Sequence, residues 1–147
     1  MVRVSRRWAF TLVEILIVVL ILTILAAAII PQFTDSTQDA KQSVMMQNLS
    51  VLRTQTGVYR AQHEALAPTS NVSTQLTSKT NIDGTTSGTP TLGPYVLLIP
   101  PNPQLDDPTK QSLISVVTTD PVANISTHGW IYNSTNGRFY AATDITQ

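Results

Sequence analysis

The chain opens with one long run of apolar residues, and no later segment resembles it. Residues 10–30 are apolar except for Thr11, Glu14 and Thr23. As a helix with a rise of about 1.5 Å per residue, this run reaches about 31 Å, close to the roughly 30 Å hydrocarbon core of a bilayer. The pattern therefore predicts a membrane-spanning helix over residues 10–30.

A weaker helical pattern follows over residues 31–66. Pro31 stands one residue beyond the run, where it removes a backbone donor and can kink a helix. At 100° per residue, seven apolar side chains then fall within an arc of about 120°, with charged residues opposite. This stripe predicts an amphipathic helix that packs on its own domain. Its members are Ala40, Val44, Val51, Leu52, Val58, Tyr59 and Leu66.

The remaining residues predict a loop and then a small sheet. Residues 67–94 are rich in Ser, Thr, Asn, Gly and Pro, which is typical of a long loop. Asn136-Gly137 predicts a hairpin, and Trp130, Tyr132 and Phe139 are expected to pack the sheet on the amphipathic helix. The expected fold is α+β, with a long N-terminal helix on an antiparallel sheet formed by residues 95–147. Four short runs predict its strands, at 95–99, 112–119, 128–133 and 138–143.

Charge gives the apolar run a direction and excludes some partners. Arg3, Arg6 and Arg7 precede the run and no acid does, which favours a cytoplasmic start and a single crossing. They are three of nine basic residues, against nine acidic ones, so the rest of the chain has no basic face and nucleic acid is not an expected partner. Cysteine is absent, which excludes disulfides, thiolate nucleophiles and zinc-thiolate sites.

Glu14 does not fit the simplest interpretations of the apolar run. The run could be a cleaved signal peptide, with Ala26 to Ala28 as its cleavage site, or an ordinary single-span anchor. Neither needs a carboxylate, which costs about 2.5 to 3.5 kcal/mol on membrane-insertion scales and usually has a partner.

The stretch AFTLVEILIVVLILTILAAAIIPQF, residues 9–33, resembles the N-terminus of the type IV pilin and type II secretion pseudopilin superfamily. The resemblance implies that a prepilin peptidase removes residues 1–9 by cutting between Ala9 and Phe10, and that the new amine of Phe10 is methylated. Glu14 falls on the family's glutamate at the fifth mature position, and Pro31 on a common proline. The family usually has Gly before the cut, whereas this chain has Ala9.

The resemblance also implies a structural role and a set of partners. In a filament of identical subunits, the ammonium of Phe10 in one copy can lie beside Glu14 of another, which would make Glu14 a register device. The implied partners are minor pseudopilins or pilins, the prepilin peptidase, an inner-membrane assembly platform and membrane lipid. The implied location is the bacterial inner membrane, with the head periplasmic or extracellular.

Three functions compete at this point. The layout is closest to a major pseudopilin, a subunit of the pseudopilus that drives protein export in type II secretion. The first alternative is a pilin of a surface pilus for adhesion, motility or DNA uptake. The absence of cysteine favours the pseudopilin, because many pilins close their C-terminal loop with a disulfide. The second alternative is a single-span membrane protein whose head binds a ligand and never polymerises.

Candidate chemistry is sparse, and no enzyme is expected. No phosphate-binding loop, dinucleotide fingerprint or nucleophile elbow occurs, and His63 and His128 lack metal-ligand spacing. Major pseudopilins often hold calcium between their C-terminal strands, and this chain has Asp106, Asp107 and Asp120 in that region. Carboxylates suit calcium, although the same residues are typical of plain turns.

Overall fold

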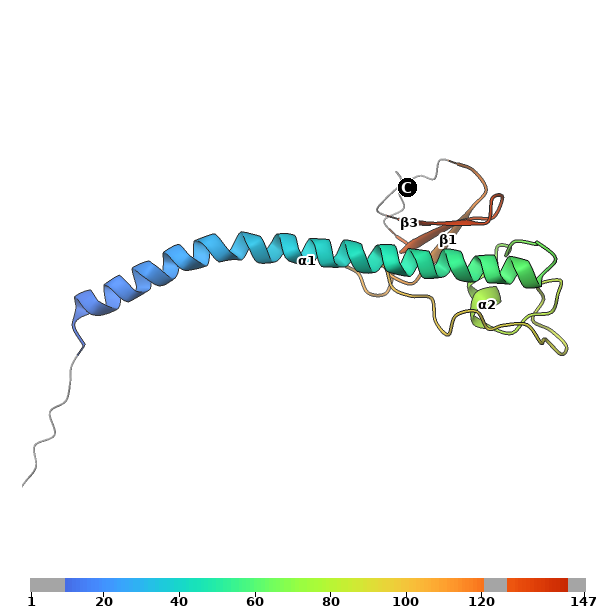
Figure 1. Cartoon of the computed structure of the whole chain (residues 1–147), viewed down its shortest axis with the longest axis horizontal. Coiled ribbons are helices and arrows are strands. Elements are labelled where there is room, and N and C mark those ends of the chain that lie inside the picture. Colours follow the sequence, from blue (N-terminus) through green and yellow to red (C-terminus); the bar gives the residue numbers. More distant parts are fainter. Residues whose placement is uncertain (1–9, 121–126, 143–147) are drawn as a thin grey trace, which may run out of the picture. The chain divides into compact units, whose positions relative to one another are not determined.

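The computed structural model describes residues 10–120 and 127–142, without the side chains of residues 28–35. These described residues form two helices and one sheet of three strands, so the expected α+β class is confirmed. The chain separates into two compact units, Met1–Asp39 and Ala40–Gln147. In chain order the elements are α1 (Leu12–Gln62), α2 (Val72–Thr77), β1 (Ile114–Val117), β2 (Trp130–Asn133) and β3 (Arg138–Ala141) (Figure 1).

The predicted membrane crossing requires a correction. Helix α1 begins inside the apolar run, at Leu12. Within the described part of the chain, however, no helix offers a stretch that is both long enough and apolar enough to cross a bilayer. This finding contradicts the transmembrane helix predicted over residues 10–30, and with it the single-pass location in the bacterial inner membrane.

The buried face of α1 in the second unit differs from the predicted stripe. Leu52 and Tyr59 are buried as expected, whereas Val44, Val51 and Val58 are 39–46% exposed. The stripe predicted from apolar residues misses the buried face because two positions of that face carry polar side chains, Thr56 and His63. The buried residues follow the helical alternation of three and four, and they are Met45, Leu49, Leu52, Thr56, Tyr59 and His63.

Local hydrogen bonds make this partly polar face possible. The hydroxyl of Thr56 donates to the carbonyl of Leu52 at 2.8 Å. His63 is fully buried and stacks on Tyr59 with ring centroids 3.7 Å apart. Its Nδ1 lies 2.8 Å from the carbonyl of Tyr59 and its Nε2 lies 2.9 Å from Oγ1 of Thr80. Since a carbonyl only accepts, Nδ1 donates its proton to Tyr59.

The sheet is mixed, which corrects the antiparallel sheet expected from the sequence. Its order is β1-β2-β3, with β1 parallel to β2 and β2 antiparallel to β3. A parallel pair needs a crossover of about a dozen residues, and residues 118–129 provide that length between β1 and β2. The predicted hairpin is confirmed, because Gly137 has a φ of 71° and its amide donates to the carbonyl of Asn133 at 2.8 Å.

Strand β2 lies at the centre of the second unit, and all four of its residues are buried. Trp130 and Tyr132 join Phe139 and the buried apolar residues of α1 in one cluster, which confirms the predicted aromatic packing. Ile131 points to the opposite side of the sheet, where it packs with Leu105 and Ala142. The sheet is therefore covered on both faces, by α1 on one side and by the loop around residue 105 on the other.

Two segments of the second unit differ from their predictions. The loop expected over residues 67–94 contains α2, which buries Val72 and Leu76. The strand expected over residues 95–99 does not form, because the amides of Tyr95 and Val96 both donate to the carbonyl of Leu76, at 2.9 and 3.0 Å. This segment is anchored to α2 instead of to the sheet.

The edge strand β3 is in contact with α1. Nε of Arg53 donates to the carbonyl of Phe139 at 3.0 Å. Burial, and then the charge of Arg138, lowers the pKa of Arg53. A helix side chain thus occupies a backbone acceptor of the edge strand.

The burial pattern predicts that substitutions of the neighbouring residues Leu52 and Val51 change the free energy of unfolding by very different amounts. Leu52→Ala should lower the free energy of unfolding by about 2 to 5 kcal/mol, because Leu52 is 0% exposed in the core. Val51→Ala, at 41% exposure, should change it by less than about 1 kcal/mol. Urea unfolding followed by tryptophan fluorescence measures both. Equal losses would mean that the predicted stripe, and not the observed face, carries the core.

Because the hydroxyl of Tyr132 is buried, we expect the free energy of unfolding to fall at alkaline pH. Its hydroxyl donates to the carbonyl of Pro68 at 2.8 Å, and burial raises its pKa. The unfolded chain ionises near the ordinary tyrosine pKa of about 10. The stabilisation is therefore complete below that pH and is lost as the pH rises toward the folded-state pKa. Between about pH 8 and pH 11 the free energy of unfolding should fall more steeply for the wild type than for Tyr132→Phe. Parallel slopes would exclude this role.

Candidate assembly surface

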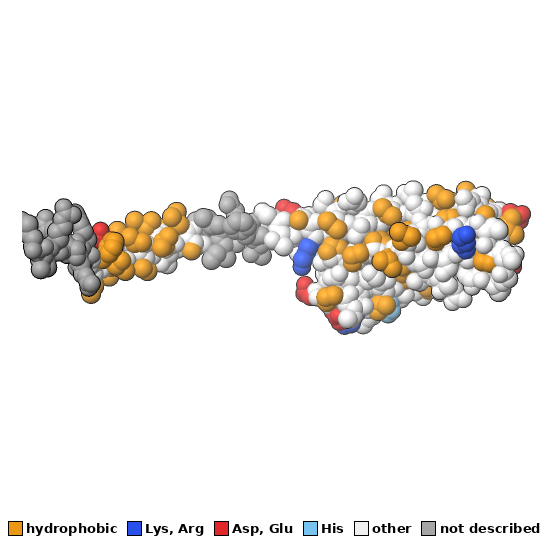
Figure 2. Space-filling view, turned by 90° about the horizontal axis from the view of Figure 1, so that it is seen from below, with side chains coloured by type: hydrophobic (Ala, Val, Ile, Leu, Met, Phe, Trp, Pro, Cys, Tyr) orange, Lys and Arg blue, Asp and Glu red, His pale blue; other side chains and the backbone are white. Residues whose placement is uncertain are grey.

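Residues 10–27 of the first unit form an apolar segment whose large side chains are uncovered. Its large hydrophobic side chains are 49–81% exposed, and Figure 2 shows them as a hydrophobic covering of this unit. Together they expose on the order of 1,000 Å² of apolar surface, which exceeds the largest patch of a typical monomer. They are Phe10, Leu12, Val13, Ile15, Leu16, Ile17, Val18, Val19, Leu20, Ile21, Leu22, Ile24 and Leu25. A helix that is apolar on every side needs a cover from outside itself.

The three polar residues of this segment differ in how they are satisfied. Oγ1 of Thr11 accepts a hydrogen bond from the amide of Glu14 at 3.2 Å. Thr23 donates its hydroxyl to the carbonyl of Val19 at 2.7 Å. The carboxylate of Glu14 has no cation within 4.0 Å among the described residues. Glu14 is thus the polar group of this segment whose partner is missing within the described chain.

Thr11 and Glu14 also form part of a helix N-terminal motif that our sequence analysis missed. Thr11 directly precedes the first residue of α1, and Glu14 lies in its first turn. A Thr followed three residues later by Glu is the signature of a capping box, in which the Thr hydroxyl accepts from the amide at the Glu position. The carboxylate also complements the positive end of the helix dipole. Glu14 therefore has two physical properties: its amide is bound by the capping residue Thr11, and its carboxylate has no cation beside it among the described residues.

The other residues expected to act in processing and assembly are described only in part. Phe10 is 74% exposed and precedes α1. Ala9 lies outside the described residues, so cleavage before Phe10 stays a prediction. The backbone of Pro31 lies within α1, which continues to Gln62, and its side chain is among those that are not described.

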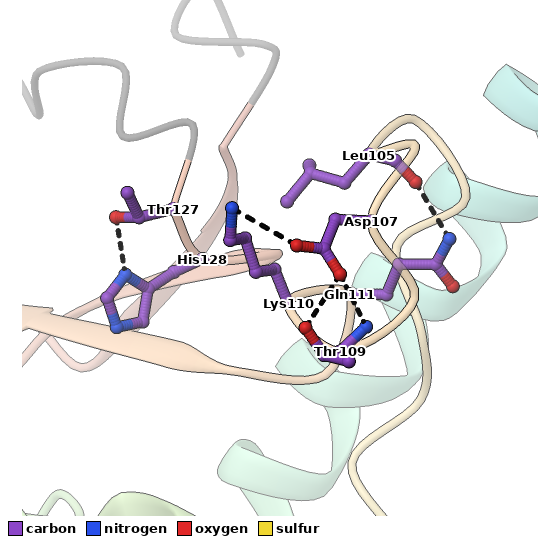
Figure 3. A network of polar contacts seen from close by, with 7 residues as sticks. All are labelled: Leu105, Asp107, Thr109, Lys110, Gln111, Thr127 and His128. Atoms are coloured by element: carbon purple, nitrogen blue, oxygen red, sulfur yellow. Dashed lines mark hydrogen bonds and ion pairs between the residues drawn. The ribbon is translucent and has the colours of Figure 1, made fainter.

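The three aspartates expected to bind calcium have separate partners. Asp106 lies 3.6 Å from Nζ of Lys41, with its carboxylate almost fully exposed. Figure 3 shows Asp107 accepting from the amide and hydroxyl of Thr109, at 3.0 and 2.6 Å, and pairing with Lys110 at 3.1 Å. These contacts, the Thr109 hydroxyl first, lower the pKa of Asp107.

Asp120 follows β1 and contacts the hairpin of β2 and β3. Its carboxylate accepts from the side-chain amides of Asn133 at 2.8 Å and Asn136 at 2.6 Å, and from Tyr140 at 3.3 Å. Among the described residues, no three His, Cys, Asp or Glu side chains gather where a metal ion could bind. The structure therefore does not bring Asp106, Asp107 and Asp120 together.

The two histidines have no common site either. Both ring nitrogens of buried His63 are hydrogen-bonded, to Tyr59 and Thr80. His128 lies just before β2, where its Nδ1 is 2.9 Å from the hydroxyl of Thr127 (Figure 3).

Comparison with known proteins adds nothing to these observations. No protein-family model, no curated protein and no solved structure matches this chain. The functional argument therefore rests on the exposed apolar segment and on the residues that begin it.

Proposed function

We propose that this chain is a structural subunit of a pilin-like filament, and specifically a pseudopilin of a protein-export fibre. The observation that carries the proposal is the uncovered apolar segment of the first unit, with Glu14 unpaired among the described residues. Many copies of one apolar helix can cover each other in a bundle. Each copy would then bury surface worth about 25 cal/mol per Å².

Glu14 gives such a bundle its register. Phe10 and Glu14 are four residues apart, which corresponds to about 6 Å of rise along a helix. If residues 1–9 are removed, Phe10 carries a new ammonium, and a copy displaced along the bundle brings this ammonium beside Glu14 of its neighbour. In an apolar bundle an unpaired carboxylate is strongly disfavoured, so copies in the wrong register are penalised.

The contacts between such copies would be heterologous, as they are in rings and in filaments. The ammonium at one position meets the carboxylate at another, so the interface joins two different patches of the same chain. Interfaces of this type produce rings or open helical filaments, depending on whether the rotation closes. Further copies of this chain are the partners that such an interface requires, and the resemblance of the N-terminus adds related minor subunits, a prepilin peptidase and an assembly platform to the proposal.

The absence of cysteine favours a pseudopilus over a surface pilus. A surface pilus for adhesion, motility or DNA uptake remains the second candidate, since its subunits use the same kind of N-terminal helix. Immunogold microscopy distinguishes the two by whether fibres of this chain extend beyond the cell surface.

The first prediction of this proposal concerns the N-terminus. Mass spectrometry of the protein from its native host should find a chain that begins at Phe10 and carries a methyl group on its amine. A chain that keeps residues 1–9 has no ammonium at Phe10, and the proposed pair could not form. A chain that begins near Ile29 would indicate an ordinary signal peptide.

The second prediction separates the two roles of Glu14. Glu14→Gln keeps a side chain that can hydrogen-bond at the capping position but removes the charge. Thr11→Val removes the cap acceptor, at a cost of about 0.5 to 2 kcal/mol of local helix stability, and keeps the charge. We expect Glu14→Gln to reduce the yield of pelleted filaments at least tenfold and Thr11→Val to reduce it less than twofold.

Sedimentation and negative-stain microscopy measure this yield, and thermal unfolding of the second unit is the control for folding. Thr23→Val is a matched substitution in the same apolar segment and should assemble normally. Equal losses for Glu14→Gln and Thr11→Val would assign Glu14 to helix capping alone.

A further inference from the structure

The second unit contains a polar cavity that the proposed filament role does not use. Its volume is about 570 Å³, within the range of small-molecule sites. Three segments form its walls: the turn before α2, α2 itself and the loop over residues 83–87. The lining residues are Thr69, Asn71, Thr74, Gln75, Asp83, Gly84, Thr85, Thr86 and Ser87.

Gln75 holds two walls of this cavity together without any ligand. It is only 5% exposed, and its Nε2 donates to the carbonyl of Gly84 at 3.0 Å. Its Oε1 accepts from the amide of Thr69 at 2.8 Å and from the Thr69 hydroxyl at 3.2 Å. One buried side chain therefore fixes the turn before α2 against the loop over residues 83–87.

The loop is also braced internally. The side-chain amide of Asn81 donates to Oγ1 of Thr85 at 2.9 Å and to the carbonyl of Ser87 at 2.7 Å. Oδ1 of Asp83 accepts from both the amide and the hydroxyl of Thr85, at 3.0 and 2.7 Å. The cavity is thus preformed, which lowers the entropic cost of binding a ligand.

Several polar groups on the walls make no hydrogen bond within the described part of the chain. The side chains of Asn71, Thr74, Thr86 and Ser87 make no hydrogen bond to any described residue. Oδ2 of Asp83 accepts none from another described residue either. The free groups are hydroxyls and an amide, which both donate and accept, and one carboxylate oxygen, which accepts.

The charge of the cavity limits the ligand further. Asp83 is the one ionisable residue in its lining, and the hydrogen bonds from Thr85 lower its pKa. A single ionised carboxylate repels phosphates and carboxylates. The lining also has no aromatic and no large aliphatic residue, so an apolar group would find no matching surface.

We propose that this cavity binds one sugar unit of a neutral glycan. Each sugar hydroxyl donates one hydrogen bond and accepts two, which matches the free groups of Asn71, Thr74, Thr86 and Ser87. Two neighbouring sugar hydroxyls can donate to the carboxylate of Asp83. Because no aromatic ring is available for stacking, binding rests on neutral hydrogen bonds, and we expect a Kd of about 1 to 10 mM.

Saturation-transfer NMR of the full chain in detergent tests this inference. The probes are the methyl glycosides of glucose, galactose, mannose and N-acetylglucosamine, each up to about 50 mM, with methyl phosphate and tetramethylammonium chloride as charged alternatives whose methyl protons can be observed. We expect transfer to at least one glycoside and none to the two ions. Absence of transfer to all four glycosides would overturn the proposal, as would transfer to either ion alone.

Variants locate the binding. Thr74→Val removes a hydroxyl and Asn71→Ala removes an amide, and neither group makes a hydrogen bond to a described residue. Both variants should therefore fold normally and bind the glycoside about 3- to 10-fold more weakly. Thr54→Val makes the same exchange as Thr74→Val at an exposed position of α1 and should bind as the wild type does. Wild-type affinity in both cavity variants would place the glycoside elsewhere and refute the site. The outcome does not depend on polymerisation, because chains that fail to form filaments still carry the cavity.

Discussion

The burial of apolar surface is the constraint on which the whole chain depends, and its two units satisfy it in different ways. The second unit buries its own large side chains, from Leu52 on α1 to Trp130 on β2, and within its described part no buried side-chain polar atom lacks a partner. The described part of the first unit covers none of its large apolar side chains. The second unit thus buries its own apolar side chains, whereas those of the first unit would be covered by other copies in the filament that we propose.

Glu14 illustrates how one residue can serve the monomer and the assembly. In the monomer its amide donates to the hydroxyl of Thr11, and its charge favours the start of α1. In the proposed bundle the same carboxylate would meet an ammonium from another copy. The two roles are compatible because only the backbone amide of Glu14 is bonded to Thr11, which leaves the carboxylate available to another copy while its charge still favours the start of α1. Because the cap fixes the first residue of α1, it also fixes the position of the Glu14 side chain along the helix axis.

The sequence was most informative where local chemistry decides the structure. The Asn136-Gly137 turn, the aromatic packing of β2 and β3 and the long helix follow from patterns a few residues long. The sequence did not predict features that depend on contacts between residues far apart in the chain. His63 is buried because Thr80 satisfies its ring, and the parallel pairing of β1 with β2 depends on residues far apart in the chain. The capping box at Thr11 also has a purely local signature, a Thr followed three residues later by a Glu, which can be read from the sequence.

The contact between Arg53 and the carbonyl of Phe139 has a consequence for how copies can meet. An edge strand with open backbone groups invites another strand to add to the sheet, which leads to irreversible aggregation. Arg53 occupies one of these groups on β3, and Arg138 places a second positive charge on the same strand. Strand addition at this edge is therefore obstructed. In the proposed filament, copies could therefore associate through their helices without adding strands to the sheet at β3.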